Sequence, residues 1–340
     1  MKIKSILSIK PIDFQWPVQD PFLFCAHHLD QYPAGNKEMG PPPESLKGRN
    51  IGQDFTIKDG WRMYHGETIP GFPEHPHRGF ETVTVVMTGF VDHSDSYKQA
   101  GRYGNGDVQW MTAGAGMQHC EMFPLINQEK DNPAELFQVW LNLPAEKKMA
   151  DPYFKMLWNE DIPVKKVLDD NGKTTTVKII TGEFEGIKSL SPAPDSWAAD
   201  PGHAVAIWTI RMEANARFSL PATEKKVSRN LYFYRGSSIE VDGTRVESLH
   251  AVELKASEPT GIINGDTDGF LFLLQGQPIA EPVAQYGPFV MNTQAEIQKA
   301  FDDYRKTKFG GWPWPRRDQV HPLEKGRFAA YADGHEEARD

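Results

Sequence analysis

The sequence predicts an all-β protein with two domains, and three observations support this prediction. The chain has 340 residues, and roughly 150 residues per domain gives about two domains. Short runs rich in β-branched and aromatic residues recur, whereas clear helical periodicity is scarce. The 29 Gly and 26 Pro are spread along the chain as turns between these runs. Short strands at such spacing are typical of a β-sandwich or a β-barrel.

The predicted strands follow one another along most of the chain. They are residues 82–87, 136–141, 175–180, 205–212, 231–234 and 270–274. Turn residues separate them, as in Thr88-Gly89 and Asp242-Gly243. A Pro-rich stretch at residues 189–201 is expected to connect the first part of the chain to a second β module.

The sequence predicts one helix, close to its end. Thr293 and Glu296 have the spacing of a capping box. The apolar side chains that follow lie on one helical face, and they are Ile297, Ala300, Phe301 and Tyr304. Gly310-Gly311 is expected to end this helix, which we interpret as a docking helix. Residues 312–340 are Pro-rich and then charged, and we expect them to lie along the surface or fray.

Composition excludes several classes of function. With 37 Lys and Arg against 46 Asp and Glu, the net charge is −9, which argues against direct binding of nucleic acid. No run approaches the roughly 18 apolar residues of a membrane span. Two cysteines cannot form a disulfide framework for a chain of this size, which favours a reducing compartment. The N-terminus lacks the apolar region of a secretory signal. The sequence therefore predicts a cytoplasmic protein without a membrane partner.

The chemically informative stretch is residues 71–123. His75 and His77 are two residues apart, as are His119 and Glu121, so each pair shares one face of an extended strand. Two neighbouring antiparallel strands would bring three imidazoles and one carboxylate together. This set suits a first-row divalent metal and leaves coordination positions open for water or substrate.

Each spacing has a simpler interpretation when it is taken alone. A single His-x-His is more often a pair of hydrogen-bonded histidines at a strand end than a metal site. The presence of both motifs, His-x-His and His-x-Glu, in one β segment favours a metal site. The other eight histidines form no comparable cluster, and we expect surface positions or local hydrogen bonds; they are His27, His28, His65, His93, His203, His250, His321 and His335.

The strings HPHRGFETVT, GDVQWMTAGAG and HCEM resemble those of the pirin branch of the cupin superfamily. Residues 20–24 and 287–293 also match stretches typical of that family. The resemblance implies two tandem cupin domains, which are jelly-roll β-barrels or sandwiches, and a C-terminal helix. The implied limits are 1–150 for a metal-binding domain, 151–311 for a domain without a metal that ends in the helix, and 312–340 for a tail.

The resemblance also implies a ligand set. The iron ligands of the family fall on His75, His77, His119 and Glu121. The general cupin pattern instead takes its carboxylate from the position of Glu81, which could be a ligand, the partner of a ligand or a buried hydrogen-bonding acid. We place Glu121 ahead of Glu81. Fe(II) is implied by the family, although Mn, Ni, Cu or Zn would fit the same donors.

Two functions follow from a pirin-like centre. One is a quercetin 2,3-dioxygenase type of reaction on a flavonol or similar aromatic with O2, in which Glu121, or else Glu81, is the base. Its expected pocket walls are Phe80, Trp110 and Phe123, unless these three serve core packing. The alternative is a non-enzymatic, iron-dependent regulator that binds a transcription factor or a metabolic enzyme. The acidic charge and the lack of a basic nuclear signal favour the oxygenase.

The second module lacks the histidine motif. Aligned on Gly89 and Gly236, its positions equivalent to His75 and His77 are Ala222 and Glu224. Asp266 and Asp268 match the other pair, but without histidines they suggest a turn. We therefore expect this domain to be structural and free of metal. In the first domain, Cys120 should point away from the metal as a small buried apolar side chain.

Overall fold

The computed structural model describes residues 5–223 and 225–339 and divides them into two compact units. Unit 1 contains residues 160–280 together with 139–144 and the N-terminal stretch that ends at Ala26. Unit 2 contains residues 27–138, 145–159 and 281 onwards. Each unit therefore draws on separate parts of the sequence, and the domain limits implied by the resemblance stay a prediction.

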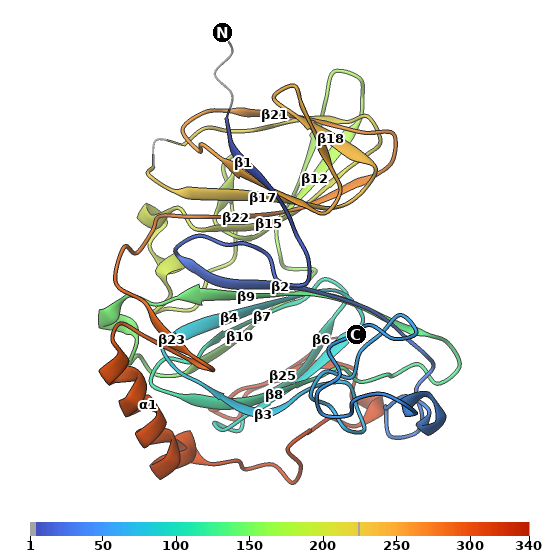
Figure 1. Ribbon diagram of the computed structural model, residues 1–340, viewed down its shortest axis with the longest axis vertical. Helices are drawn as coiled ribbons and strands as arrows, with labels where there is room; N and C mark the ends of the chain where they lie inside the picture. The colour runs from blue at the N-terminus through green and yellow to red at the C-terminus, as the bar shows by residue number, and fades with distance from the viewer. Residues whose placement is uncertain (1–4, 224, 340) are drawn as a thin grey trace. The chain divides into compact units, whose positions relative to one another are not determined.

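Unit 1 consists mainly of two antiparallel sheets (Figure 1). The seven-stranded sheet has the order β1 (Ile6–Pro11), β20 (His250–Leu254), β17 (Ser228–Arg235), β22 (Gly269–Gly276), β15 (Ala206–Met212), β12 (Thr174–Thr181) and β11 (Val164–Leu168). The four-stranded sheet has the order β16 (Arg217–Leu220), β21 (Thr260–Asn264), β18 (Ser238–Val241) and β19 (Thr244–Glu247). A short hairpin pairs β13 (Glu183–Phe184) with β14 (Ile187–Lys188).

The interior of unit 1 is apolar. Strands of both sheets contribute to one cluster, with Ile179, Leu231 and Leu273 from the larger sheet and Leu220 and Val241 from the smaller. Alternation of apolar and polar residues along the smaller sheet produces this packing, because every second side chain points inward. Hydrophobic burial between two facing sheets therefore holds this unit together.

Unit 2 also has two main sheets. The five-stranded sheet has the order β10 (Tyr153–Leu157), β7 (Val108–Thr112), β4 (Phe80–Thr88), β9 (Asn132–Asn142) and β2 (Phe22–Tyr32), of which β9 and β2 each run on into unit 1. The six-stranded sheet has the order β26 (Glu336–Arg339), β25 (Arg327–Ala330), β6 (Ala100–Gly104), β5 (Phe90–Asp95), β8 (Met117–Met122) and β3 (Gly71–His77). Thr84 of β4 reaches Glu121 of β8, so the two sheets face each other.

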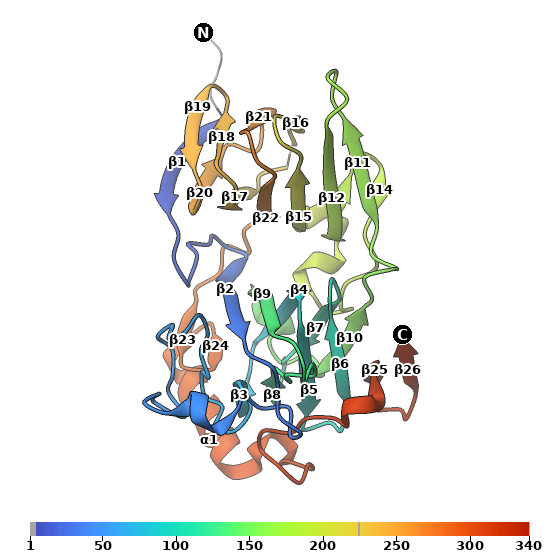
Figure 2. The same ribbon diagram turned by 90° about the vertical axis from the view of Figure 1, so that its right-hand side faces the viewer.

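The C-terminal helix packs within unit 2. The helix α1 (Gln294–Thr307) begins with the predicted capping box, in which Thr293 accepts from the backbone N–H of Glu296. Ile297 and Ala300 are buried against Phe289 of the hairpin formed by β23 (Ala284–Tyr286) and β24 (Phe289–Met291). Figure 2 shows α1 next to this hairpin. The docking role predicted for the helix is confirmed for its buried face.

Residues 312–340 were expected to lie along the surface or fray, and the structure corrects this expectation over the strands β25 and β26. Residues of β25 pair with β6, and Phe328 is buried. The buried guanidinium of Arg102 binds both carboxylate oxygens of Asp92, at 2.7 and 2.8 Å, and also donates to the carbonyl of His321 at 2.8 Å. Because every one of these bonds is charge-assisted, the segment is fixed to the sheet.

The remaining elements are short. The 3-10 turns are Pro43–Leu46, Ala145–Lys147, Trp197–Ala199, Pro201–His203, Lys308–Gly310 and Leu323–Lys325. All six strands predicted from the sequence are confirmed: five lie within β4, β9, β12, β17 and β22, and residues 205–212 match β15 except for Val205. The all-β class with one C-terminal α-helix is confirmed as well. Over the described residues, no helix has the length and apolarity required to cross a membrane.

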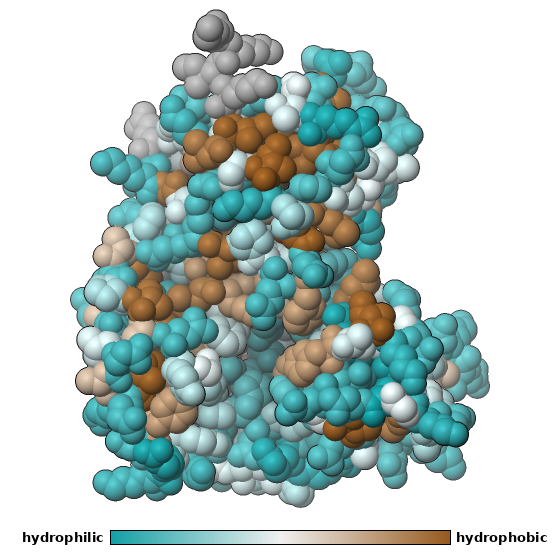
Figure 3. Space-filling model, in the orientation of Figure 1, coloured by the Kyte–Doolittle hydropathy of each residue, from teal (hydrophilic) through white to brown (hydrophobic). Residues whose placement is uncertain are grey.

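The surface drawn in Figure 3 is mostly hydrophilic, and its hydrophobic residues form separate groups. One group lies over β1 of unit 1, where Leu7 is 60% exposed. In unit 2 the same view shows a recess over the region between β4 and β8. The interior between the facing sheets of unit 2 is therefore approached from this side.

Candidate metal centre

Antiparallel pairing of β3 with β8 creates the site. His75 lies directly opposite His119 in the register of these strands, and His77 lies opposite Met117. An irregularity in the register between Phe72 and His75 determines which side chains of β3 point to which face of the sheet. Alternation along the strand then brings His75 and His77 to the face that carries His119.

The three imidazoles converge as the spacing predicts. Their candidate ligand atoms all lie within 4.8 Å of one another. The ring centroids are 4.4 Å apart for His75 and His119, 4.7 Å for His75 and His77, and 4.9 Å for His77 and His119. Three imidazoles in this arrangement could bind one metal ion.

Two backbone carbonyls orient two of the rings. The Nδ1 atom of His75 lies 2.9 Å from the carbonyl oxygen of Pro73, and Nδ1 of His77 lies 3.3 Å from that of Pro288. A carbonyl oxygen can only accept, so Nδ1 carries the proton in both rings and the lone pair of Nε2 is left for a metal. His119 has no hydrogen-bond partner for either ring nitrogen among the described residues.

Burial keeps these rings neutral. It lowers the pKa of His75 to about 4 and holds the pKa values of His77 and His119 well below the usual 6.5. The neighbouring imidazoles lower the pKa of His119 further, because each would repel its positive charge. Neutral imidazole is the form that binds a metal, and unpartnered nitrogens in a buried position otherwise cost stability. The donor set therefore fits a divalent ion.

Glu121 lies next to this triad but is also held by the opposite sheet. Its Oε2 atom is 3.8 Å from Nε2 of His119 and accepts from the Gln138 amide at 3.2 Å. Its Oε1 atom lies 3.1 Å from the hydroxyl of Thr84. Burial raises the pKa of this carboxyl group above its ordinary value. Glu121 is thus close to the imidazoles without belonging to the three-histidine cluster.

Glu81 has a different environment. It is fully buried on β4, and its Oε1 atom accepts from the hydroxyl of Thr112 at 2.7 Å and from the indole of Trp110 at 3.1 Å. Of the three roles that the sequence left open for Glu81, these bonds fit the buried hydrogen-bonding acid. The indole N–H of Trp110 is therefore used in the hydrogen bond to Glu81.

The segment around α1 packs against the end of β3, the strand that carries His75 and His77. Arg78, directly after His77, forms an ion pair with Asp303 at 2.8 Å and donates to the carbonyl of Ala115 at 2.7 Å. The ring of Phe309 lies under this guanidinium, 4.6 Å away, and against Gly116. A side chain at Gly116 would place its Cβ 2.6 Å from that ring, at a backbone φ of +136°, so glycine is required there.

The expected pocket walls are all buried. Phe80 contacts the ring of His77 with centroids 5.0 Å apart, and Phe123 contacts Tyr64 at 5.8 Å. Phe72 was missed in the sequence, although its ring lies 6.4 Å from that of His75 and it is partly exposed. Phe72 directly precedes the Pro-x-His step of residues 73–75, and this position gave no local signal, because the register irregularity determines which way the side chain faces.

His93 was expected to be isolated, and the structure corrects this. Its ring is buried, 5.5 Å from that of His119, and stacks on Phe154. Its Nε2 atom lies 3.2 Å from the Asp95 carboxylate, which is the expected local hydrogen bond. The pairing of His93 with Glu121 across β5 and β8 brings it here, and a sequence without sheet register cannot show this.

Cys120 faces the other side of the sheet. It is buried in a cluster with Ile69 and Met122, on which Trp312 and Val320 of the C-terminal segment pack. Burial raises the pKa of its thiol, so it is protonated and unreactive at neutral pH. Cys25 is likewise buried, and both cysteines are free.

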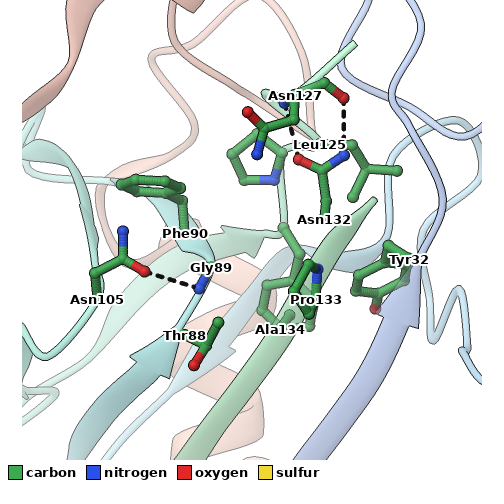
Figure 4. A pocket seen from close by; sticks show the side chains of 12 residues that line it. Tyr32, Thr88, Gly89, Phe90, Asn105, Leu125, Asn127, Asn132, Pro133 and Ala134 are labelled. Carbon is green, nitrogen blue, oxygen red and sulfur yellow. Dashed lines mark hydrogen bonds between the residues drawn. The ribbon is translucent and has the colours of Figure 1, made fainter. Parts of the chain in front are cut away.

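A separate pocket in unit 2 does not contain the histidine triad (Figure 4). Its volume is about 140 Å³, and its lining includes Phe90, Asn105, Asn127 and Asn132. The amide of Asn105 accepts from the backbone N–H of Gly89, and Asn132 accepts from that of Asn127. These amides close turns, so we interpret this pocket as a structural gap between loops.

Two β-barrel units, one of which carries three converging histidines, define a bicupin protein with a candidate metal site. Residues 19–141 match the family model for pirin, and residues 207–310 match the one for the pirin C-terminal cupin domain. The chain is 37% identical over 244 residues to Pirin-1 of Arabidopsis thaliana, covering 71% of this chain and 78% of that protein. The chain belongs to the pirin family, as the motifs predicted.

Two further similarities extend this result. The chain is 36% identical over 256 residues to Pirin of Homo sapiens, which covers 73% of this chain and 80% of that protein. A solved structure of quercetin 2,3-dioxygenase from Acinetobacter baumannii superposes with a TM-score of 0.71 at 27% identity. This superposition covers 91% of this chain and 99% of the other.

Proposed function

We propose that unit 2 binds one divalent metal ion through His75, His77, His119 and Glu121. We further propose that this centre cleaves a flavonol or a similar aromatic with O2, as a quercetin 2,3-dioxygenase does. The observation that carries the proposal is the buried His119. Its two ring nitrogens lack hydrogen-bond partners among the described residues, and its candidate ligand atom lies within 4.8 Å of those of His75 and His77. Similarity to the Acinetobacter baumannii enzyme supports the reaction type.

Fe(II) is the ion we expect, and Mn, Ni, Cu or Zn would suit the same donors. When bound, a redox-capable ion supplies the interaction with O2 and with the substrate hydroxyl. The chain itself supplies three neutral imidazoles, two of them oriented by the carbonyls of Pro73 and Pro288. Orientation by fixed backbone groups reduces the entropy that binding would otherwise cost.

Glu121 is the proposed base that takes the proton of the substrate hydroxyl. Burial raises the pKa of this carboxyl group, which makes its carboxylate a stronger acceptor of a proton than an exposed one. The hydroxyl of Thr84 and the amide of Gln138 hold its oxygens in place. We place Glu81 second as the base: Trp110 and Thr112 donate to one oxygen of its carboxylate, whereas Glu121 lies 3.8 Å from Nε2 of His119.

Reconstitution tests the proposal. The metal-free protein is loaded in turn with Fe(II), Mn, Ni or Cu and mixed with quercetin under air. We expect loss of flavonol absorbance together with release of carbon monoxide, as the opening of the central ring with O2 requires. Turnover with none of these metals would contradict the dioxygenase proposal. If the loaded protein then retained a stable protein partner in pull-downs, the regulatory alternative would be favoured.

We also propose a cellular location for the protein. Both cysteines are free and buried, which supports the cytoplasmic location proposed from the sequence. The substrates proposed are a small planar aromatic and O2, with no direct contact to nucleic acid.

A further inference from the structure

A continuous cluster of aromatic rings runs from the surface of unit 2 to the metal centre. Neighbouring rings in it are 4.9 to 6.3 Å apart between centroids. The cluster consists of Phe55, His65, Tyr64, Phe72, His28 and Phe123. Tyr64, His28 and Phe123 are buried, whereas Phe55 is 44% exposed.

Phe72 joins this cluster to the candidate metal ligands. Its ring lies 6.4 Å from the ring of His75 and 6.3 Å from that of Phe55. Phe72 and His75 are both partly exposed, whereas His77 and His119 are buried. His75 is therefore the most exposed of the three histidines, and Phe72 lies beside it.

The position of Phe55 is fixed by its neighbours. Asp54, directly before it, exchanges two backbone hydrogen bonds with Tyr64, at 2.8 and 2.9 Å. The carboxylate of Asp54 also binds the buried guanidinium of Arg49 at 3.0 Å. The hydroxyl of Tyr64 donates to the buried Asp30 at 2.6 Å. An exposed ring on a fixed backbone can receive another ring at a low cost in conformational entropy.

We propose that Phe55 and Phe72 bind the planar ring of an aromatic substrate next to His75, with Phe55 as the specificity-determining residue. Flat, fused aromatic rings would gain both apolar burial and ring contacts with these two side chains. The choice of a flavonol as the probe rests on the proposed function. Phe55 and Phe72 would then contact the substrate, in place of the buried Phe80, Trp110 and Phe123.

Binding without turnover tests this assignment. The metal-loaded protein is titrated with quercetin under nitrogen in a calorimeter, since the reaction cannot proceed without O2. We expect Phe55→Ala to raise the Kd about three- to tenfold, the range expected for the loss of one ring contact. Phe55→Trp should keep the Kd within about twofold of wild type, because it retains a ring.

The matched control is Ile57→Ala. Ile57 lies in the same loop and is 59% exposed, so its loss removes apolar surface without removing a ring. Metal content and melting temperature are measured for every variant to confirm that fold and loading are intact. Equal Kd values for Phe55→Ala and Ile57→Ala would overturn the proposal, as would a wild type that binds no quercetin under nitrogen.

The same variants separate this proposal from the proposed function. Binding that depends on Phe55, without turnover in air, would support the aromatic site and refute the dioxygenase. Turnover in air with equal Kd values for Phe55→Ala and Ile57→Ala would support the dioxygenase and refute the role of Phe55.

Discussion

The two units have a similar architecture but opposite interiors. Between its sheets, unit 1 packs side chains such as Ile179, Leu231 and Leu273. At the corresponding place between its own sheets, unit 2 holds His119 and Glu121. Apolar packing stabilises a fold without further cost, whereas a buried unpartnered imidazole destabilises it. Apolar burial therefore explains the interior of unit 1, whereas the imidazoles of unit 2 are explained by a candidate metal site.

Removing an imidazole from unit 2 should have the largest effect. We expect His77→Ala or His119→Ala to lower metal content from about one ion per chain to near zero, because an open site needs three protein ligands. Elemental analysis after reconstitution measures this, and circular dichroism checks that the strands persist. Wild-type metal content in these variants would refute the ligand assignment.

Removing an apolar side chain from unit 1 should act on stability alone. Leu273 is fully buried in the apolar cluster. Leu273→Ala should therefore lower the free energy of unfolding by about 2–5 kcal/mol, as a cavity forms. Urea unfolding followed by fluorescence gives this value. Metal content should stay at the wild-type level, and a loss of metal would contradict the independence of the two interiors.

A buried lysine in unit 2 should make stability depend on pH. Burial lowers the pKa of Lys148 from 10.5 to about 8, while its Nζ atom donates to the carbonyls of Gly79 and Val290. Between pH 8 and 10.5 the unfolded chain binds more protons at this group than the folded chain, so the free energy of unfolding rises with pH.

This contribution is complete above pH 10.5 and is lost as the pH falls through about 8. The difference in unfolding free energy between wild type and Lys148→Met should therefore grow by about 1–2 kcal/mol from pH 8 to pH 9.5. Urea unfolding at several pH values measures it. A difference that is constant with pH would mean that Lys148 titrates normally.

The smallest effect is expected at the ion pair between Arg78 and Asp303. Because Asp303 is partly exposed, Asp303→Ala should cost no more than about 1 kcal/mol of stability. Metal affinity should fall several-fold, since Arg78 follows His77 directly. Competition with a chelator measures the affinity. Lys299→Ala is the control, because it removes the other cation on Asp303 and leaves Arg78 in place.

The sequence predicted the histidine triad because strand alternation is a local rule. Because His75 and His77 are two residues apart, they share one face of their strand. Pairing of this strand with the one that carries His119 then forms the cluster. The strands and the capping box of α1 were predictable for the same reason. Glu121 as a ligand and Glu121 as a base stay predictions.

What the sequence did not reveal depends on contacts between distant segments. Pro288, whose carbonyl orients His77, is 211 residues away from it. His93 approaches His119 through sheet register, and Phe55 approaches Phe72 through a loop. The expectation for the C-terminal segment failed at β25 and β26, because charge and proline content say little about strands that pair with another sheet. Glu224, expected to replace a histidine in the second module, lies outside the described residues, and that module stays predicted to be free of metal.

The course of the chain has a consequence for biosynthesis. All of unit 1 precedes residue 281, whereas β25, α1 and Pro288 come later and belong to unit 2. A ribosome therefore delivers all residues of unit 1 while unit 2 still lacks β25, β26 and the carbonyl that orients His77. Because domains fold as their residues emerge, we expect the candidate metal site of unit 2 to form after the apolar interior of unit 1.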